Sequence, residues 1–402
     1  MGKVFIIFRS GISGGTATLS IRIGEYLVSQ GHKVIYICQT INDENNLKTM
    51  EEKGVKICKW KLREIAKNLS KHYEGISFDV LTYSLDEFLF IEELRKKIRI
   101  NRNILYVVHH YGLIKGKNKK NIFMKYIKSF YSDIINKSIE CNSVIFMDTT
   151  AIKETEKFYD CRLNRSKALV INLPMKVRGL DYSIIEQKFK SKTFNILSIA
   201  RAEFPFKGYL VGLIEEFEKL CSLNSNLNLT ILTFGKDKDR VIERINKLPK
   251  VVKDKVVIVG QTPYEGLKMY FDNSRIYIGM GTTVLDAVNF GVPSLLAPQY
   301  TYENYTSGFF HHQPNLLVAD SNIRRQICTV VQNVQNMGKK EYIELCEKEH
   351  AALAEFYDVN IMIDFLKQDS QLNDCSKITS RHLLIHRFFR VITNSMRKLN
   401  FK

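Results

Sequence analysis

Arg201 and Lys207 are the two residues of this chain whose types and spacing are best suited to chemistry. The apolar run from Phe194 to Ala200 predicts a buried parallel strand, and a helix is expected from Gly208 onward. Both cations therefore belong to the loop at the carboxyl end of a strand, the edge where open α/β sheets bind ligands. Arginine offers paired donors to phosphate oxygens and lysine a compact charge, so the pair suits a diphosphate. The alternative is a pair of solvated loop cations without a specific role.

A second set of ligand-binding candidates lies in the segment that runs from Gly279 to Pro293. A glycine turn at Gly281 is followed by a helix start at Thr282 or Thr283, and Asp286 comes one turn later. The first-turn amides and the threonine hydroxyls can bind phosphate, and the carboxylate can accept hydrogen bonds from ribose or sugar hydroxyls. The alternative for Asp286 is that it only stabilises the early turns of the helix through the dipole.

In the first half of the chain, Gly11-Ile-Ser-Gly-Gly-Thr16 follows the first expected strand and opens a helix. The backbone at Gly14, Gly15 and Thr16 can approach a ligand closely, and the helix start favours an anion. A dinucleotide fold would need Gly-x-Gly-x-x-Gly and an acidic residue after the second strand, where this chain has Gln39. NAD binding is therefore disfavoured.

His109 and His110 come directly after the expected strand from Ile104 to Val108. One of the two imidazoles is therefore expected at the carboxyl edge of the first sheet. Successive strand residues point to opposite sides, so the choice between the two histidines stays open. A purely structural histidine is the alternative.

Asp237 and Asp239 could suggest metal-binding acids, but they stand where a helix begins after an apolar strand. We expect them to supply negative charge to the helix N-terminus, and they predict no metal site.

The size of the chain, 402 residues, suggests two or three domains at roughly 150 residues each, and two fit best. Its 45% apolar and 25% charged residues are ordinary for a soluble protein, and no run of about 18 apolar residues could span a bilayer. The start lacks the pattern of a signal peptide, and the eight cysteines are scattered, so we expect reduced thiols in the cytosol. The net charge of +18 calls for a polyanionic partner or surface.

Short β-rich runs alternate with helical patterns in two series, which predicts parallel, doubly wound sheets in an α/β protein. The first series of strands is expected at 4–8, 33–38, 78–83, 104–108, 143–147 and 168–172. The second is expected at 194–200, 227–233, 255–259, 276–278, 294–297 and 316–318. The order of motifs thus restarts near residue 190.

These two series predict two Rossmann-like domains that face each other across a cleft. The first domain is expected at 1–175, a linker at 176–192 and the second domain at 193–340. Residues 341–368 are expected as one long helix or a pair of helices that crosses back to the first domain. Residues 369–402 form a basic amphipathic tail.

Positive charge is concentrated in two segments. From Arg95 to Ser132 there are eleven Lys or Arg and no acid, and from Cys375 to Lys402 there are seven and again no acid. Apolar residues are interleaved with the cations in both segments, which is typical of helices that lie on an anionic membrane. Packing on the protein itself and a disordered end are the alternatives for the tail. Nucleic acid is disfavoured because no recognisable binding module accompanies the lysines.

Taken in this order, the glycine loop, the histidine after a first-domain strand, Arg201 with Lys207, and the run Asp286-Ala-x-x-x-Gly-x-Pro resemble the group 1 retaining glycosyltransferases of the two-domain GT-B type. The resemblance is to the family four-like members of bacterial surface polysaccharide assembly. It spans most of residues 1–365 and is most specific between 194 and 300.

The resemblance implies that Arg201 and Lys207 grip the diphosphate of a nucleotide sugar and that Asp286 contacts the ribose. It also implies that His109, or else His110, contacts the donor sugar, and that Gly14 and Gly15 lie near the donor phosphates and the acceptor. The second domain would then bind the nucleotide sugar and the first the acceptor. The implied reaction needs no metal and no cofactor other than the donor substrate, since the cations and the helix start can stabilise the departing diphosphate.

The chain departs from the family's Glu-x7-Glu pattern, because Ile278 stands where the first Glu is common and Asp286 replaces the second. Donor recognition is then expected to use the backbone around Gly281 to Thr283. We expect a hexosyltransferase-type enzyme that is cytoplasmic and peripheral on the inner face of the cell membrane. Its acceptor is expected to be lipid-linked or a polysaccharide, for example in capsule biosynthesis. A non-catalytic partner subunit and a nucleotide-sugar epimerase are the alternatives.

Overall fold

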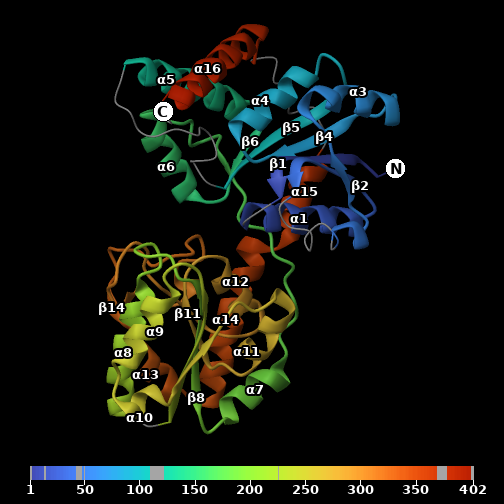
Figure 1. Cartoon of the computed structure of the whole chain (residues 1–402). Coiled ribbons are helices and arrows are strands. Elements are labelled where there is room, and N and C mark those ends of the chain that lie inside the picture. Colours follow the sequence, from blue (N-terminus) through green and yellow to red (C-terminus); the bar gives the residue numbers. More distant parts are fainter. Residues whose placement is uncertain are drawn as a thin grey trace. The chain divides into compact units, whose positions relative to one another are not determined.

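The computed structural model describes residues 2–12, 15–41, 48, 50–108, 122–224, 226–368 and 378–399. The chain divides into two compact units (Figure 1). Unit 1 consists of Met1–Pro174 together with Val359–Lys402, and unit 2 of Met175–Asp358. Over the described ranges, no helix is both long enough and apolar enough to cross a bilayer.

Unit 1 is built on a seven-stranded sheet with the order β3-β2-β1-β4-β5-β6-β7, in which all neighbouring strands are parallel. Its strands are β1 (Val4–Ile12), β2 (Lys33–Ile41), β3 (Lys56–Lys59), β4 (Phe78–Thr82), β5 (Ile100–Val107), β6 (Val144–Phe146) and β7 (Leu169–Val170). Its helices are α1 (Gly15–Ser29), α3 (Leu62–His72), α4 (Leu85–Leu94), α5 (Ile122–Glu140), α6 (Thr149–Tyr159), α15 (Val359–Lys367) and α16 (Ser380–Leu399).

Unit 2 repeats this plan with a five-stranded parallel sheet in the order β10-β9-β8-β11-β12. Its strands are β8 (Phe194–Arg201), β9 (Leu227–Phe234), β10 (Val256–Val259), β11 (Ile276–Gly279) and β12 (Ser294–Leu296), with a small antiparallel pair of β13 (Tyr305–Thr306) and β14 (Arg325–Gln326). Its helices are α7 (Tyr182–Lys190), α8 (Tyr209–Leu223), α9 (Lys238–Asn246), α10 (Lys250–Lys253), α11 (Lys268–Asp272), α12 (Thr282–Asn289), α13 (Ile327–Asn336) and α14 (Lys339–Tyr357). The short 3₁₀ turns are η2 (Tyr264–Leu267) and η3 (Phe310–His312).

Each sheet forms because its central strands are continuous apolar runs that helices cover on both faces. All five residues of β4 are buried, and Ile196, Leu229 and Ile276 on neighbouring strands of unit 2 are fully buried. Strands that are buried on both faces carry this pattern in parallel α/β sheets. The prediction of two doubly wound parallel-sheet α/β domains is confirmed.

In both sheets the order in which the chain adds strands reverses once. In unit 1 the chain builds β1, β2 and β3 to one side and then returns to place β4 on the other side of β1. In unit 2 it builds β8, β9 and β10 and then places β11 on the other side of β8. In open α/β sheets, ligands bind outside the carboxyl ends of the strands at such a switch point, here β1/β4 and β8/β11.

Two expectations about elements were wrong. Residues 316–318 are apolar but form a loop, because the carbonyl of Leu317 accepts a hydrogen bond from the amide of Gly281 at 2.7 Å instead of joining a ladder. The expected linker at 176–192 contains α7, whose Ile185 is buried in the core of unit 2, so this segment is not a free connector.

The last segments of the chain are divided between the units. The expected helix or pair of helices is a pair, since α14 ends at Tyr357 and α15 begins at Val359. Helix α14 belongs to unit 2, whereas α15 and α16 belong to unit 1. The chain enters unit 2 at Met175 and leaves it at Asp358, and these two residues pair with each other. The amide of Met175 also donates to the carbonyl of Tyr357 at 2.7 Å.

Candidate functional site

Arg201 and Lys207 lie together at the carboxyl end of β8. Arg201 is the last residue of the strand, its side chain is 57% exposed, and its Nη2 lies 2.7 Å from Oε2 of Glu203. Lys207 is half-buried, and burial together with the nearby charge of Arg201 lowers the pKa of its ammonium group. Two cations at the switch point of the sheet are of the types that suit an anion, and the carboxylate of Glu203 now offsets part of their charge.

The loop that carries both cations is fixed by Asp237. Its Oδ2 accepts a hydrogen bond from the amide of Phe204 at 2.8 Å, and its own amide donates to the carbonyl of Ala202 at 3.2 Å. Asp237 occupies the N-cap position of α9 but its side chain does not cap the helix, so it holds the loop rather than serving only the helix terminus as expected. Asp239 does lie in the first turn of α9.

Helix α12 brings its N-terminus to the same edge. Gly281 precedes the helix with a φ of 78°, a conformation that side chains disfavour. The hydroxyl of Thr283 lies 2.6 Å from the phenol oxygen of Tyr277, which donates to the carbonyl of Ile199 on β8 at 3.2 Å. The first turn of α12 is thereby tied to the strand that ends in Arg201. Because Thr282 is exposed while the hydroxyl of Thr283 is engaged, Thr282 and the first-turn amides are the groups open to an anion.

Asp286 lies in the second turn of α12 and is only 4% exposed. Its Oδ1 accepts a hydrogen bond at 3.0 Å from the hydroxyl of Tyr264, which belongs to the turn η2 after β10. Asp286 thus lies one turn into the helix, as expected, and its carboxylate is held by Tyr264. The sequence offers no signal for the contribution of Tyr264, because the two residues are brought together only by the fold.

In unit 1 the structure places Gly15 at the start of α1, directly after β1. Thr16 follows in the first turn of this helix. Gly14, His109 and His110 lie outside the described residues, and so does the basic run 115–120. The strand that precedes the histidines, β5, ends at Val107.

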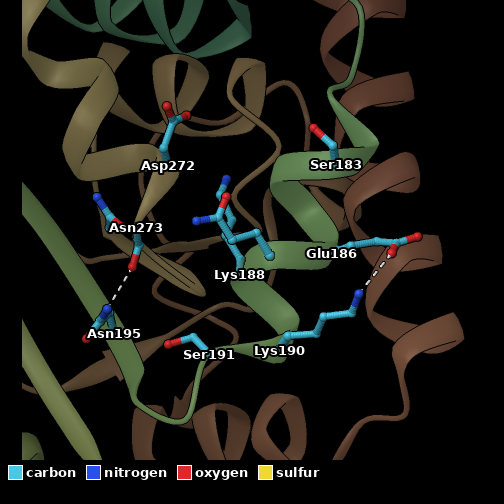
Figure 2. Close-up of a pocket in the computed structure, with 9 residues that line it drawn as sticks. Ser183, Glu186, Lys188, Lys190, Ser191, Asn195, Asp272 and Asn273 are labelled. Atoms are coloured by element: carbon cyan, nitrogen blue, oxygen red, sulfur yellow. Dashed lines mark hydrogen bonds and ion pairs between the residues drawn. The ribbon is translucent and has the colours of Figure 1, made fainter.

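A separate depression of about 690 Å³ lies at the opposite edge of the sheet of unit 2 (Figure 2). It is bordered by α7, by Asp272 and Asn273 at the end of α11, and by Asn195 near the start of β8. Lys188, which is 3% exposed, donates to the carbonyl of Phe290 at 2.9 Å, and its burial lowers the pKa of its ammonium group to about 8. Phe290 ends α12, so Lys188 stabilises the C-terminus of that helix. The depression is not part of the Arg201 edge.

Comparisons with known proteins give structural neighbours only. No protein-family model and no curated protein matches the sequence. A glycosyltransferase from Rickettsia africae matches with a TM-score of 0.64 at 16% identity, over 91% of this chain and 98% of that one. The Anabaena protein HepE, solved in complex with UDP and glucose, matches with a TM-score of 0.59 at 11% identity, over 92% and 100%.

A sucrose-phosphate synthase from Thermosynechococcus elongatus matches with a TM-score of 0.54 at 13% identity, over 98% of this chain and 100% of that one. At such low identities the likeness shows the fold. With its two parallel-sheet α/β units, the chain has the GT-B fold of glycosyltransferases.

Proposed function

We propose that the protein is a hexosyltransferase-type glycosyltransferase that moves a sugar, with retention, from a nucleotide-sugar donor to a lipid-linked or polysaccharide acceptor in cell-surface glycan biosynthesis. One observation carries the proposal: Arg201, Lys207 and the first turn of α12 meet at the switch point of the sheet in unit 2. A fork of donors, a compact cation and free helix amides together suit a diphosphate.

The proposed mechanism rests on the charge that develops as the bond between the sugar and the diphosphate breaks. Arg201, Lys207 and the amides near Thr282 stabilise this charge on the leaving nucleoside diphosphate, while the acceptor hydroxyl attacks from the same face of the sugar. Asp286 holds the ribose hydroxyls. The reaction needs no metal, because fixed cations neutralise the leaving group.

The proposal also assigns roles to residues of unit 1. Gly14, Gly15 and Thr16 would let donor phosphates and acceptor approach the backbone, and His109 or His110 would contact the donor sugar. The start of α1 at Gly15 supports the first role, since a helix N-terminus favours an anion.

We also propose that the enzyme works at the inner face of the cell membrane, bound to anionic lipid. The net charge of +18 supports this location. Further support comes from α16, whose described arginines, Arg381, Arg387 and Arg390, are exposed.

The test is to incubate the purified protein with a panel of nucleotide sugars and extracted glycolipid acceptors and to measure release of nucleoside diphosphate. Arg201→Ala should lower turnover roughly a hundredfold or more, because removing one preorganised charge contact costs about 2.7–4 kcal/mol of barrier. Arg324→Ala is the matched control, since Arg324 is 54% exposed and also pairs with a glutamate, Glu303, in the same unit.

The outcomes of this test separate the alternatives. Unchanged turnover in Arg201→Ala would remove this residue from the mechanism. A protein without affinity for any nucleoside diphosphate would be a non-catalytic partner subunit, and conversion of the donor without an acceptor would identify an epimerase.

A further inference from the structure

Arg9 on β1 and Tyr83 directly after β4 carry buried hydrogen-bond donors without partners. Among the described residues, Nε and Nη1 of Arg9 and the hydroxyl of Tyr83 are buried and find no hydrogen-bond partner. The guanidinium group of Arg9 lies over the ring of Tyr83, with its central carbon 5.2 Å from the ring centroid. The two nitrogen atoms can only donate and the hydroxyl can donate as well, so one hydrogen-bond acceptor could serve all three groups.

Both residues lie at the switch point of the sheet in unit 1. β1 and β4 are neighbours, and their register pairs Phe8 with Thr82, the last residue of β4. Arg9 and Tyr83 each come one residue later, so they sit side by side at the carboxyl edge, where the order of the strands reverses. This is the place where open α/β sheets bind ligands.

The surroundings of Arg9 supply no countercharge within hydrogen-bond reach. The buried carboxylate of Glu87 accepts the amide of Tyr83 at 3.2 Å, and among the described residues Arg9 makes no hydrogen bond and no ion pair. Burial raises the pKa of Tyr36 to about 12 and raises the pKa of Tyr83 as well, and the charge of Arg9 opposes both shifts. The guanidinium group of Arg9 thus lies against the ring of Tyr83 and near that of Tyr36 in electrostatic terms, without an ion pair among the described residues.

Two other arginines of unit 1 that are largely buried have hydrogen-bond partners. Arg95 donates to the carbonyl of Ile100 and pairs with Glu92, although its Nη2 is also buried without a partner, and Arg102 donates to three backbone carbonyls. A buried donor without a partner destabilises the folded protein, and the penalty is larger for a charged group. The stacking of Arg9 on Tyr83 offsets part of that penalty but satisfies none of the N–H groups. A bound anion would satisfy them, since a guanidinium fork matches the oxygens of phosphate and carboxylate groups.

We propose that Arg9 and Tyr83 form an anion-binding site that holds a phosphate or carboxylate group of the acceptor. The site itself follows from unit 1 alone, and only its assignment to the acceptor rests on the proposed glycosyltransferase function. Arg9 supplies N–H donors at Nε and Nη1, and Tyr83 supplies its hydroxyl. Arg9 as a whole is only partly buried at this edge of the sheet, although its Nε and Nη1 atoms are themselves buried.

The test uses the full-length chain with the proposed donor site of unit 2 filled by saturating UDP. Glucose 1-phosphate, glucuronate and glucose are then titrated as probes. We expect binding of at least one of the two anionic probes and none of glucose, and whichever anion binds more tightly identifies the group. Arg9→Met should weaken that binding by about tenfold or more, and Tyr83→Phe by less, because a charged donor contributes more than a neutral one.

Thermal unfolding without ligand distinguishes a binding role from a structural one. Replacing an unpaired buried cation by an apolar side chain of similar volume should leave the melting temperature of Arg9→Met unchanged or raised. Arg95→Met is the matched control: it removes a paired arginine, so it should lower the melting temperature and leave probe affinity intact. A lower melting temperature together with unchanged probe affinity in Arg9→Met would overturn the proposal.

The two proposals fail in different ways. If UDP does not bind to the wild-type chain, the donor site of the proposed function is wrong, while binding of an anionic probe that depends on Arg9 would still establish the site in unit 1. If UDP binds and neither anionic probe does, the site in unit 1 is wrong. Arg201→Ala should weaken UDP binding without changing the effect of Arg9→Met.

Discussion

At the scale of single residues, the charge of Lys207 should set how the proposed donor site responds to pH. Burial, and then the neighbouring charge of Arg201, lowers the pKa of Lys207 below its ordinary value of 10.5. A diphosphate prefers the charged ammonium group, so affinity for UDP should fall as the pH rises through this lowered pKa. Lys207→Arg keeps its charge and should move the alkaline loss of affinity to higher pH. Calorimetric titration of UDP from about pH 7 to about pH 10 measures the effect.

Arg201→Met provides a second check on the same residue. Removing the like charge should raise the pKa of Lys207, so the alkaline loss of affinity should also shift upward even though binding is weaker at every pH. Superimposable pH profiles for the wild type and Lys207→Arg would show that Lys207 does not contact the diphosphate.

The residues that the sequence identified are those whose role follows from local order. Arg201, Lys207 and Gly281 each follow a buried strand and precede a helix, so their place at the carboxyl edge could be predicted. The roles of Asp237 and Tyr264 could not be predicted, because their partners are distant in the chain. Asp237 contacts Phe204, 33 residues away, and Tyr264 contacts Asp286, 22 residues away. The contact between Arg9 and Tyr83 could not be predicted either, because Arg9 lies within one strand and Tyr83 follows another.

At the scale of elements, the start of α8 depends on two glycines that let the loop after β12 pack on the helix. A Cβ atom at Gly208 would lie 2.6 Å from the carbonyl oxygen of Thr301, and one at Gly212 would lie 2.7 Å from that of Tyr302. The amide of Tyr300 donates to the carbonyl of Phe206 at 3.0 Å, so this loop also braces the segment that carries Lys207.

Gly212→Ala should therefore destabilise the protein although alanine favours helices. The gain in helix propensity is about 1 kcal/mol, whereas forcing backbone atoms apart in a packed contact costs about 1–3 kcal/mol. Gly179→Ala is the control, since a Cβ atom there meets nothing within 4 Å. Thermal unfolding should show a lower midpoint for Gly212→Ala and an unchanged or higher one for Gly179→Ala, and a raised midpoint for Gly212→Ala would contradict the packing argument.

Helix α16 combines an anchored face with an exposed apolar stripe. Leu383 is buried in the core of unit 1, and His386 is buried with its Nδ1 2.9 Å from the hydroxyl of Tyr131 on α5. Leu384, Phe388 and Val391 are 67%, 60% and 65% exposed, and their spacing of four and three residues puts them on one stripe of the helix. Figure 1 shows α16 beside α5 and α4.

Replacing Leu384, Phe388 and Val391 together by serine should weaken binding to anionic lipid vesicles by at least tenfold while the anchored face keeps the helix in place. Burial of three large apolar side chains contributes several kcal/mol, at about 1.5–3 kcal/mol each. Sedimentation with vesicles that contain phosphatidylserine measures the loss, which should be greater at higher salt.

Val251, Val257 and Met269, three exposed apolar residues of unit 2, provide the matched control when changed to serine. Equal losses in the two triple variants, or binding to neutral vesicles as strong as to anionic ones, would rule out α16 as the specific membrane contact.

Elements with an apolar run of their own could be predicted from the sequence, whereas the edge strand β3 could not. The apolar runs of β1, β8 and β9 fix these strands without reference to the rest of the fold. β3 has four residues, two of them lysines, and exists because it pairs with β2 at the edge of the sheet. Residues 316–318 show the converse, since their apolar character serves burial beside the Gly281 turn and not a strand.

At the scale of the whole molecule, the two units repeat one arrangement. In each sheet the first strand borders the switch point and carries an arginine there, Arg9 on β1 just beyond the end of its pairing with β4 and Arg201 at the end of β8. The arginine of unit 2 is exposed and paired with a carboxylate, whereas that of unit 1 is partly buried and unpaired among the described residues. One plan therefore carries both of the anion sites that we propose.

The units differ in how the chain builds them, and this leads to a prediction about fragments. Unit 2 is continuous from Met175 to Asp358, and these two residues pair where the chain enters and leaves it. Unit 1 needs residues 359–402. Nη1 of the buried Arg102 donates to the carbonyls of Phe365, Leu366 and Gln368 at 3.0 Å each, and Leu383 completes the core.

The fragment 175–358 should therefore fold alone and bind UDP, whereas 1–174 alone should not fold cooperatively. Each hydrogen bond lost by a charged buried donor costs about 1.5–3 kcal/mol, and a domain has only about 5–15 kcal/mol of stability in all. Joining 1–174 to 359–402 by a short Gly-Ser linker should restore folding, because the two ends meet where Met175 pairs with Asp358. Circular dichroism and hydrogen exchange measure folding, and calorimetry measures UDP binding. A folded 1–174 would show that the returning helices are not needed, and a folded 175–358 without affinity for UDP would mean that Arg201 and Lys207 do not suffice to hold the donor's diphosphate.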